Sequence, residues 1–314
     1  MKTMNSTNNQ IPLSFVIFLI TVDSLFIIIG VTGNVLVILY NVRWNKDKNT
    51  TSYFVINLAL SDLVVCGITF PMAIAKNTLV LMGKTDILCE LFISILYASL
   101  SLSVVNLMML TIDRYICIAL PLKYPQIVTQ RKVSIALVSV WITGFLNFLM
   151  IFFTSKPSDM PFICEMNKIT ASVGTFFFFF VPLGVTIVFN AKIVQIARSQ
   201  GRKIAAQASL SQTNNSTAAD DLNSRRNFSR QMKLFKTIRV VFGCFLFCVT
   251  PFPMIVFIEF VICDHGCIPL KVQIGILLLA ATNSITNAFI YGIRDKKYRR
   301  SFKQMFARCC NLSG

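Results

Sequence analysis

Charged residues and histidine are scarce in this 314-residue chain. Only 14% of its residues are charged, 13 are acidic, and His265 is the one histidine. A single histidine with scattered acids provides no pairing of nucleophile and base, so the sequence offers no support for enzymatic activity. A soluble protein of this length rarely has so little charge, with 55% hydrophobic residues and a mean hydropathy of +0.67. The composition is therefore that of a membrane protein.

Two further features are missing. No charged and then apolar leader with a cleavage site precedes the first apolar stretch, so we expect the first helix to act as the insertion signal. The two halves of the chain show no internal repeat, and the repeated, broken half-helices of transporters are therefore not indicated.

Seven apolar stretches are long enough to span a bilayer as helices, and no room remains for an eighth. They cover residues 14–41, 52–75, 88–119, 132–154, 170–196, 235–262 and 270–292. The sequence therefore predicts an all-α fold, a seven-transmembrane helix bundle over residues 14–292. A short amphipathic helix at the membrane surface and a cytoplasmic tail are expected over 293–314.

The net charge of +17 is distributed on one side. Basic residues dominate the segment between spans five and six and the tail after span seven, so both are expected in the cytoplasm. This distribution argues against nucleic acid as a partner. An odd number of spans then makes residues 1–13 extracellular, in a multi-pass protein of the plasma membrane. The glycosylation sequon at Asn5 agrees with this orientation.

Two cytoplasmic segments have distinct compositions. Residues 199–229 are rich in Ser, Asn, Gln, Ala and Thr, which predicts a disordered loop. In the tail, Tyr298 and Phe302 begin an apolar series at helical spacing on an otherwise basic helix, which is expected to contact membrane lipids. Cys309 and Cys310 follow as candidates for S-palmitoylation.

Four cysteines fall on the predicted outer side, where disulfides persist. Compartment and count favour a bridge between Cys89 and Cys164, which would hold the loop before span five over the bundle. Cys263 and Cys267 flank His265, and a small disulfide ring is favoured there over a metal site.

Asp62 lies within the second span, where an unpaired carboxylate costs about 2.5–3.5 kcal/mol on insertion scales. It is therefore expected to face the bundle interior. The neutral oxygen-bearing side chains that can converge on it are Asn34, Ser103, Asn283, Ser284 and Asn287. Such a cluster suits a sodium ion, the only candidate for a bound cofactor, or else a structural hydrogen-bond network; the spacing leaves both open.

Asp113-Arg114-Tyr115 closes the third span, 25 residues after Cys89, which is about one bilayer thickness at roughly 1.5 Å per residue. Together with Asn34, Asp62 and Tyr291 at their relative spacings, these motifs resemble the rhodopsin-like, or class A, G-protein-coupled receptor family over the whole chain. The other matches are Asn57, Trp141, Pro182, Phe245, Cys248, Pro251, Asn283, Ser284 and Asn287. The resemblance implies coupling to a heterotrimeric G protein through Asp113, Arg114 and Tyr115, with Pro121 and Leu122 as the second-loop element that contacts it.

Several positions depart from that family's pattern. Val249 replaces the usual tryptophan of span six, and Ala288 replaces the span-seven proline, which should leave that helix less kinked. Asn190 replaces a tyrosine of span five, and Gln231 stands where some relatives place a glutamate. Activation is therefore expected to differ in detail or to be weak.

The ligand is an extracellular small molecule or peptide whose class is narrowed by exclusion. Leu96 stands where amine receptors carry an aspartate, and Ala281 stands at the retinal lysine position, so neither usual amine recognition nor a Schiff base is expected. Partial resemblances to the amine, adenosine and melanocortin branches leave the subfamily open. The expected pocket lining comprises Asp23, Lys76, Leu96, Tyr97, Leu100, Phe252 and Val256, with Asp23 and Lys76 as the polar residues that orient the ligand.

The leading function is thus a receptor that couples an extracellular ligand to a cytoplasmic G protein by rearranging its helices. The alternatives are an ion transporter or channel in which Asp62 and Asn287 line the path, and a receptor-like protein that no longer signals.

Overall fold

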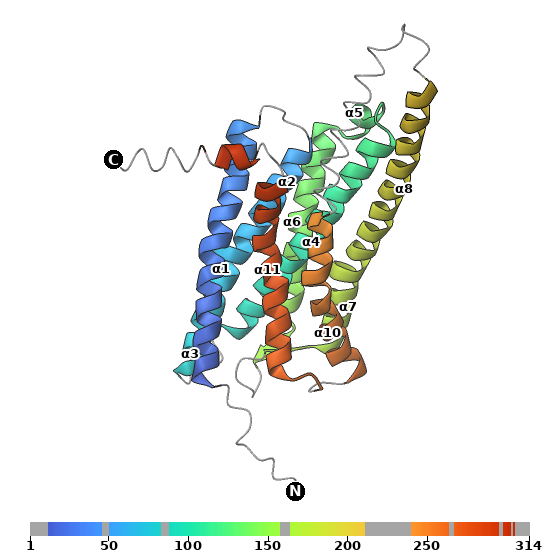
Figure 1. Cartoon of the computed structure of the whole chain (residues 1–314). Coiled ribbons are helices and arrows are strands. Elements are labelled where there is room, and N and C mark those ends of the chain that lie inside the picture. The colour runs from blue at the N-terminus through green and yellow to red at the C-terminus, as the bar shows by residue number, and fades with distance from the viewer. Residues whose placement is uncertain are drawn as a thin grey trace, which may run out of the picture.

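The computed structural model describes residues 12–45, 50–82, 88–157, 164–210, 240–263, 267–294, 298–302 and 304. Within this part of the chain, seven helices are long and apolar enough to cross a membrane (Figure 1). They are Leu13–Trp44, Thr50–Leu79, Cys89–Ala119, Gln130–Phe152, Lys168–Ser199, Val240–Phe257 and Leu270–Ile293. Each coincides with one predicted span. The predicted all-α seven-helix bundle is confirmed, and the protein is a multi-pass membrane protein.

The spans are built from shorter elements. In chain order these are α1 (Leu13–Leu39), η1 (Tyr40–Trp44), α2 (Thr50–Val64), η2 (Val65–Thr69), α3 (Phe70–Leu81), α4 (Cys89–Ala119), α5 (Tyr124–Ile127), α6 (Gln130–Phe152), β1 (Ser155–Pro157), β2 (Cys164–Met166), α7 (Lys168–Thr175), η3 (Phe176–Phe180), α8 (Val181–Leu210), a helix over 240–249, α10 (Pro251–Phe257), η5 (Ile258–Ile262) and α11 (Leu270–Arg294). Residues 298–302 are helical and follow α11. Strands β1 and β2 pair antiparallel, with Lys156 opposite Glu165.

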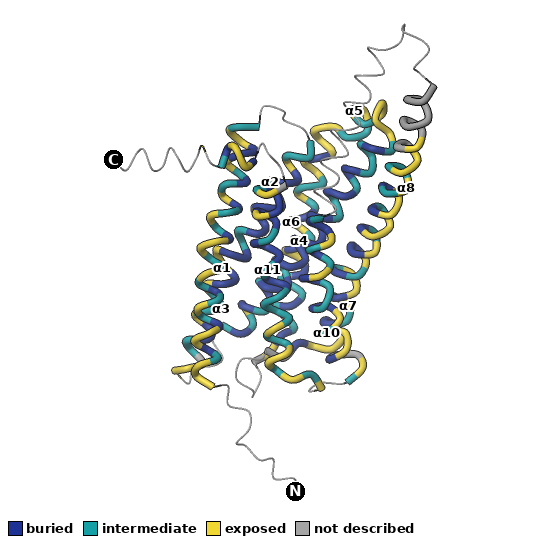
Figure 2. Tube along the Cα trace, in the orientation of Figure 1, coloured by how far each residue is buried: buried dark blue, intermediate teal, exposed yellow. Residues whose placement is uncertain are grey.

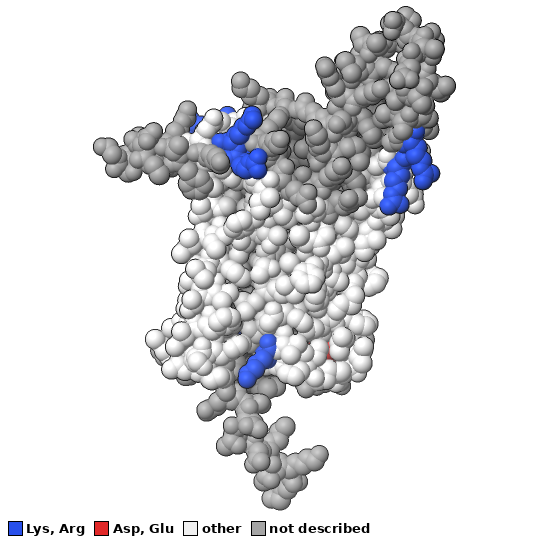
Figure 3. Space-filling view, viewed as in Figure 1, with Lys and Arg blue, Asp and Glu red and all other residues white. Residues whose placement is uncertain are grey.

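The bundle has two ends (Figure 1). We call the end at which α1 begins the N-terminal face, and it also carries β1 and β2. We call the end at which α11 finishes the C-terminal face, and it also carries α5. Described Lys and Arg side chains gather mainly at the C-terminal face, while the middle of the visible surface is uncharged (Figure 3). This uncharged belt is what a helix bundle presents to lipid.

The α4 helix is the centre of the bundle. It packs against α2, α6 and α8, and most of its residues are buried (Figure 2). Serines along α4 satisfy their hydroxyls locally: Ser99 donates to the carbonyl of Leu96, and Ser101 to that of Ala98. Because these side chains are small, neighbouring helices approach α4 closely.

Two π-helical turns have a common cause in proline. The η2 turn ends two residues before Pro71, and η3 ends two residues before Pro182. Proline lacks the amide hydrogen that an α-helix needs at that position, so the preceding turn widens. The wider turn changes the direction in which the following side chains point. In this way η2 turns α3 relative to α2.

Glycine permits close contact between α1 and its neighbours. A Cβ atom added at Gly30 would overlap Sγ of Cys66, and one added at Gly33 would lie 2.8 Å from Cβ of Ala288. Ala288, which replaces the expected proline, therefore packs directly on the first helix. The α11 helix is continuous from Leu270 to Arg294 around it.

Gly30→Ala is expected to destabilise the bundle by about 1–3 kcal/mol, because the added methyl group must displace Cys66. Gly67→Ala is the matched control, since no atom lies within 4 Å of its added Cβ. Thermal unfolding of both variants in lipid nanodiscs measures the difference. Equal melting temperatures would show that the contact between α1 and η2 tolerates a methyl group.

The predicted disordered loop over 199–229 is wrong for its first part. Residues 199–210 continue α8 as a helix, because this stretch contains Arg, Lys, Ala and Gln, which favour helices. Residues 211–229 lie outside the described residues.

The disulfide ring between Cys263 and Cys267 is present, with 5.9 Å between the two Cα atoms. Ile268 donates its backbone N–H to the Glu259 carboxylate, which holds this ring against the end of α10 and η5. Cys89 is also disulfide-bonded, whereas Cys66, Cys117, Cys244 and Cys248 are free.

The side chain of Cys164, the predicted partner of Cys89, lies outside the described side chains. Non-reducing peptide mapping is expected to recover one peptide that joins Cys89 to Cys164, because β2 meets α4 at the N-terminal face. Recovery of either cysteine as a free thiol from folded protein would contradict this pairing.

Candidate functional site

The Asp113–Arg114 pair lies at the C-terminal end of α4. Arg114 donates from Nη2 and Nε to Oδ2 of Asp113, at 2.6 and 3.0 Å. The exposed fractions of the two residues are only 3% and 5%. A buried pair of this kind is sensitive to the loss of one partner, because the remaining charge is left uncompensated.

Two further side chains hold this pair, and the sequence analysis missed both. The hydroxyl of Tyr124, in α5, donates to Oδ1 of Asp113 at 2.6 Å, and the hydroxyl of Thr51, in α2, donates to Oδ2 at 3.2 Å. Arg114 also donates to Thr51. Burial and the neighbouring carboxylate raise the pKa of Tyr124 to about 12, so its phenol stays protonated and remains a donor.

The other residues predicted for G-protein contact surround this pair. The ring of Tyr115 packs edge-on against Phe189 of α8, with 4.9 Å between centroids. Pro121 is exposed, and Leu122 is 91% exposed. An apolar side chain so exposed beside a buried ion pair is available for contact with another protein.

Asp62 occupies the middle of the bundle and is completely buried. Asn287 donates to its Oδ2 at 2.9 Å, Ser103 donates to its Oδ1 at 3.5 Å, and Ser284 faces the same carboxylate. The α2, α4 and α11 helices thus meet at one carboxylate.

Two members of the predicted cluster do not reach Asp62 by a hydrogen bond. Asn34 instead donates to the backbone carbonyls of Gly30 and Ser284, both at 2.9 Å, because its amide satisfies backbone oxygens where α1 meets α11. Asn283 lies one helical turn from Asn287, and its buried Oδ1 has no hydrogen-bond partner within the described chain. The buried hydroxyl of Tyr291 is likewise without one, and its ring stacks on Tyr298.

A second buried hydrogen-bond network was not predicted from the sequence. Asn57 donates to Oδ1 of Asn106 at 2.5 Å, Asn106 donates to the Ser61 hydroxyl, and the Trp141 indole donates to Oδ1 of Asn57. It joins α2, α4 and α6. Asn57 and Trp141 carried a motif signal in the sequence, but Asn106 and Ser61 gave none beyond being polar in an apolar span.

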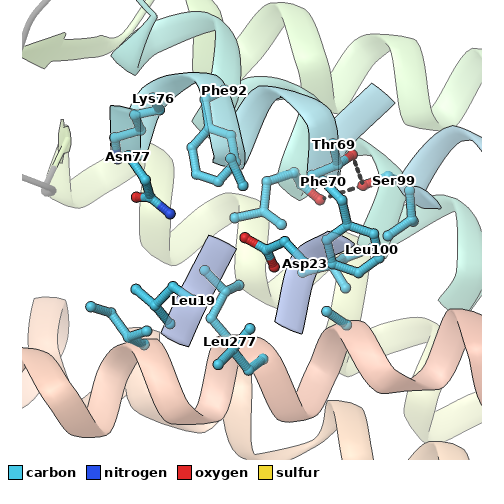
Figure 4. A pocket seen from close by; sticks show the side chains of 16 residues that line it. Leu19, Asp23, Thr69, Phe70, Lys76, Asn77, Phe92, Ser99, Leu100 and Leu277 are labelled. Atoms are coloured by element: carbon cyan, nitrogen blue, oxygen red, sulfur yellow. Dashed lines mark hydrogen bonds between the residues drawn. The ribbon is translucent and has the colours of Figure 1, made fainter. Parts of the chain in front are cut away.

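A cavity of about 100 Å³ opens between α1, α3, α4 and α11 near the N-terminal face (Figure 4). Of the predicted ligand residues, Asp23, Lys76, Leu96 and Leu100 line it. Asn77 and Phe92 also line it and were missed.

Tyr97, Phe252 and Val256 are not among the residues that line this cavity, so their role as ligand residues stays a prediction. Tyr97 follows Leu96 by about 100° around α4, which turns its ring toward Phe179 and Phe252 instead. Those three rings pack edge to face or tilted, with centroids 5.3 to 6.4 Å apart, and fill the space beside the cavity. Val256 is buried in the same apolar core.

The positions that depart from the family pattern are buried where they are described. Val249 is 2% exposed, and Asn190 donates to the carbonyl of Thr186 while its Oδ1 has no partner among the described residues. Gln231 lies outside the described residues.

Residues 33–291 match the 7 transmembrane receptor (rhodopsin family), and the chain belongs to this family. The match contains both networks, the Asp113–Arg114 pair and most of the residues that line the cavity.

Several receptors are similar to the chain. The octopamine receptor beta-1R of Drosophila melanogaster is 30% identical over 88% of this chain and 59% of its own length. The alpha-1A adrenergic receptor of Oryzias latipes is 26% identical over 91% of this chain and 66% of its own. The histamine H2 receptor of Cavia porcellus is 26% identical over 98% of this chain and 85% of its own. The chain therefore spans about two thirds or less of the first two.

Proposed function

We propose that this protein is a G-protein-coupled receptor of the plasma membrane, with its N-terminus outside and its C-terminal face in the cytoplasm. The observation that carries the proposal is the buried Asp113–Arg114 pair at the C-terminal face, held by Tyr124 and Thr51. The one-sided distribution of basic residues supports the orientation.

In the proposed mechanism, the pair stabilises the resting arrangement of the helices. Arg114 is neutralised and buried there, so it is not available to a partner. An activating ligand binds preferentially to an arrangement in which α4 and its neighbours have shifted, which releases Arg114 toward the G protein. Leu122 and Pro121 provide apolar contact beside it.

The ligand enters from the N-terminal face, where the cavity lined by Asp23 and Leu96 lies between four helices. The similar receptors are named for octopamine, adrenergic and histamine ligands, which supports a small molecule as the ligand class.

The test is expression of the full chain in cells with each class of G protein, measuring nucleotide exchange with and without a ligand library. We expect ligand-dependent activation of at least one class. A receptor-like protein that no longer signals is the second candidate, favoured by Val249 and Ala288. Normal surface delivery with no activation in any combination would establish that second candidate.

We further propose that the Asp62 cluster binds sodium and that the bound ion favours the resting arrangement. A buried carboxylate with hydroxyl and amide oxygens nearby suits a hard monovalent cation, and the buried Oδ1 of Asn283 lacks a partner on the same face of α11. Asn287 and Ser103 would orient the carboxylate. Glycosylation at Asn5 and palmitoylation at Cys309 and Cys310 remain predictions, because these residues lie outside the described ones.

A further inference from the structure

Asp23 is an acidic side chain in the wall of the cavity near the N-terminal face. It lies in the outer half of α1, one turn after Leu19, and it is 4% exposed. Within the part of the chain that the structure describes, it has no hydrogen bond and no ion pair. Its carboxylate points into the space between Leu19, Leu277 and Phe92 (Figure 4).

Among the described residues, no positive charge or hydrogen-bond donor contacts the Asp23 carboxylate. The surrounding wall is mostly apolar, formed by side chains such as Val65, Phe70 and Leu278; of the polar residues in it, Thr69 and Ser99 bond with each other. Burial of an ionised carboxylate without a partner is unfavourable, and acidic residues within a span are retained where they meet a partner or a substrate. The missing partner is a cation.

Lys76 does not supply that cation in the structure. Its Nζ lies 4.9 Å from the centroid of the Phe92 ring, and Lys76 makes a further interaction of its own. Figure 4 shows Lys76 on the far side of Phe92 from Asp23. The Lys76 ammonium therefore interacts with the Phe92 ring, whereas the Asp23 carboxylate faces the cavity.

The size and lining of the cavity define what accompanies the cation. A volume of about 100 Å³ is of the order that holds one small ring. Leu96 and Leu100 of α4 and Ala281 of α11 have apolar side chains. None of the three can therefore compete with Asp23 for a cation.

We propose that Asp23 is the anchor for a small ligand that carries one ammonium group on a compact apolar body. The ammonium pairs with the carboxylate of α1, and the apolar body fills the space between α3, α4 and α11. This inference rests on the proposed receptor function and specifies its ligand class.

The test uses purified full-length protein in nanodiscs and three probes that share one ring: benzylamine, benzyl alcohol and benzoate. Thermal stabilisation and saturation-transfer NMR measure binding. We expect benzylamine to bind at least tenfold more tightly than benzyl alcohol, and benzoate to bind no better than the alcohol. Asp23→Asn is expected to lower benzylamine affinity at least tenfold, while Glu90→Gln, an acid of α4 outside the cavity lining, leaves it unchanged.

Equal binding of the three probes, preference for benzoate, absence of benzylamine binding, or unchanged affinity in Asp23→Asn would each overturn the proposal. If Asp23→Asn does not fold, the order of the probes on the wild type decides. The cavity-filling variant Ala73→Phe then serves as the second test, since Ala73 lines the cavity and its replacement must abolish benzylamine binding.

Failure of the Asp23 site and failure of the receptor function would give different results. Binding through Asp23 without activation of any G protein would support the site and contradict signalling. Activation of a G protein without benzylamine binding would leave the receptor function and remove Asp23 as the anchor.

Discussion

Arg114→Ala is expected to abolish G-protein activation while the protein still reaches the cell surface. The guanidinium is the only group of the Asp113–Arg114 pair that can meet an anionic or carbonyl-rich partner surface, and its side chain packs at the end of α4 rather than in the centre of the bundle. The measurement is nucleotide exchange on the G protein, normalised to surface receptor. Arg131→Ala is the matched control, because Arg131 is exposed at the same face.

The reciprocal variant acts in the opposite direction. Asp113→Asn removes the charge that holds Arg114 and leaves a buried cation uncompensated, at a cost of about 3–5 kcal/mol to the resting arrangement. Since every 1.4 kcal/mol or so shifts an equilibrium about tenfold, basal signalling should rise at least tenfold. Tyr124→Phe, which removes one donor to the same carboxylate, should raise it less. Normal signalling by Arg114→Ala would refute the proposed role of the pair.

Asp62→Asn is expected to remove the response of the receptor to sodium. An ion that binds one helix arrangement more tightly shifts the equilibrium by its differential affinity, typically 5–150-fold, and opposes an activating ligand reciprocally. In the wild type, replacing potassium by sodium at constant ionic strength should therefore lower basal nucleotide exchange severalfold. The variant should give the same rate in both salts.

The variant should remain folded, because asparagine keeps the size of Asp62 and can still bond with Asn287 and Ser103. Glu90→Gln, an acid outside the cluster, controls for the loss of one negative charge. Identical rates in sodium and potassium for the wild type would leave the cluster a purely structural network.

The bundle was predictable because its signal is local. A span requires about twenty apolar residues in a row, and every such stretch became a helix. The buried Asp62 was equally visible, since a carboxylate inside a span must turn inward. The sequence could not show which amides would reach it. Asn34 and Asn287 both lie at suitable heights, yet only the packing of α1 on α11 directs Asn34 to a backbone carbonyl.

The same limit applies to the two ends of the bundle. Tyr124 and Thr51 meet Asp113 across chain separations of 11 and 62 residues, and neither residue type signals such a contact. Leu96 and Tyr97 are adjacent in sequence, but Leu96 lines the cavity and Tyr97 packs against Phe252. Their positions in the sequence could not show which of the two lines the cavity. Residues 199–210 show the converse, since composition suggested disorder where helix propensity prevailed.

The two buried networks also order events during biosynthesis. Asn57, Asn106, Ser61 and Trp141 all belong to the first four spans, so their mutual bonds can form once α6 has entered the bilayer. Asp62 meets Asn287 only after the ribosome has delivered the last span. A nascent chain that stops before α11 therefore exposes a carboxylate without its amide inside the membrane. That carboxylate keeps its bond from Ser103 but lacks the one from Asn287, which distinguishes a chain without its last span from a complete one.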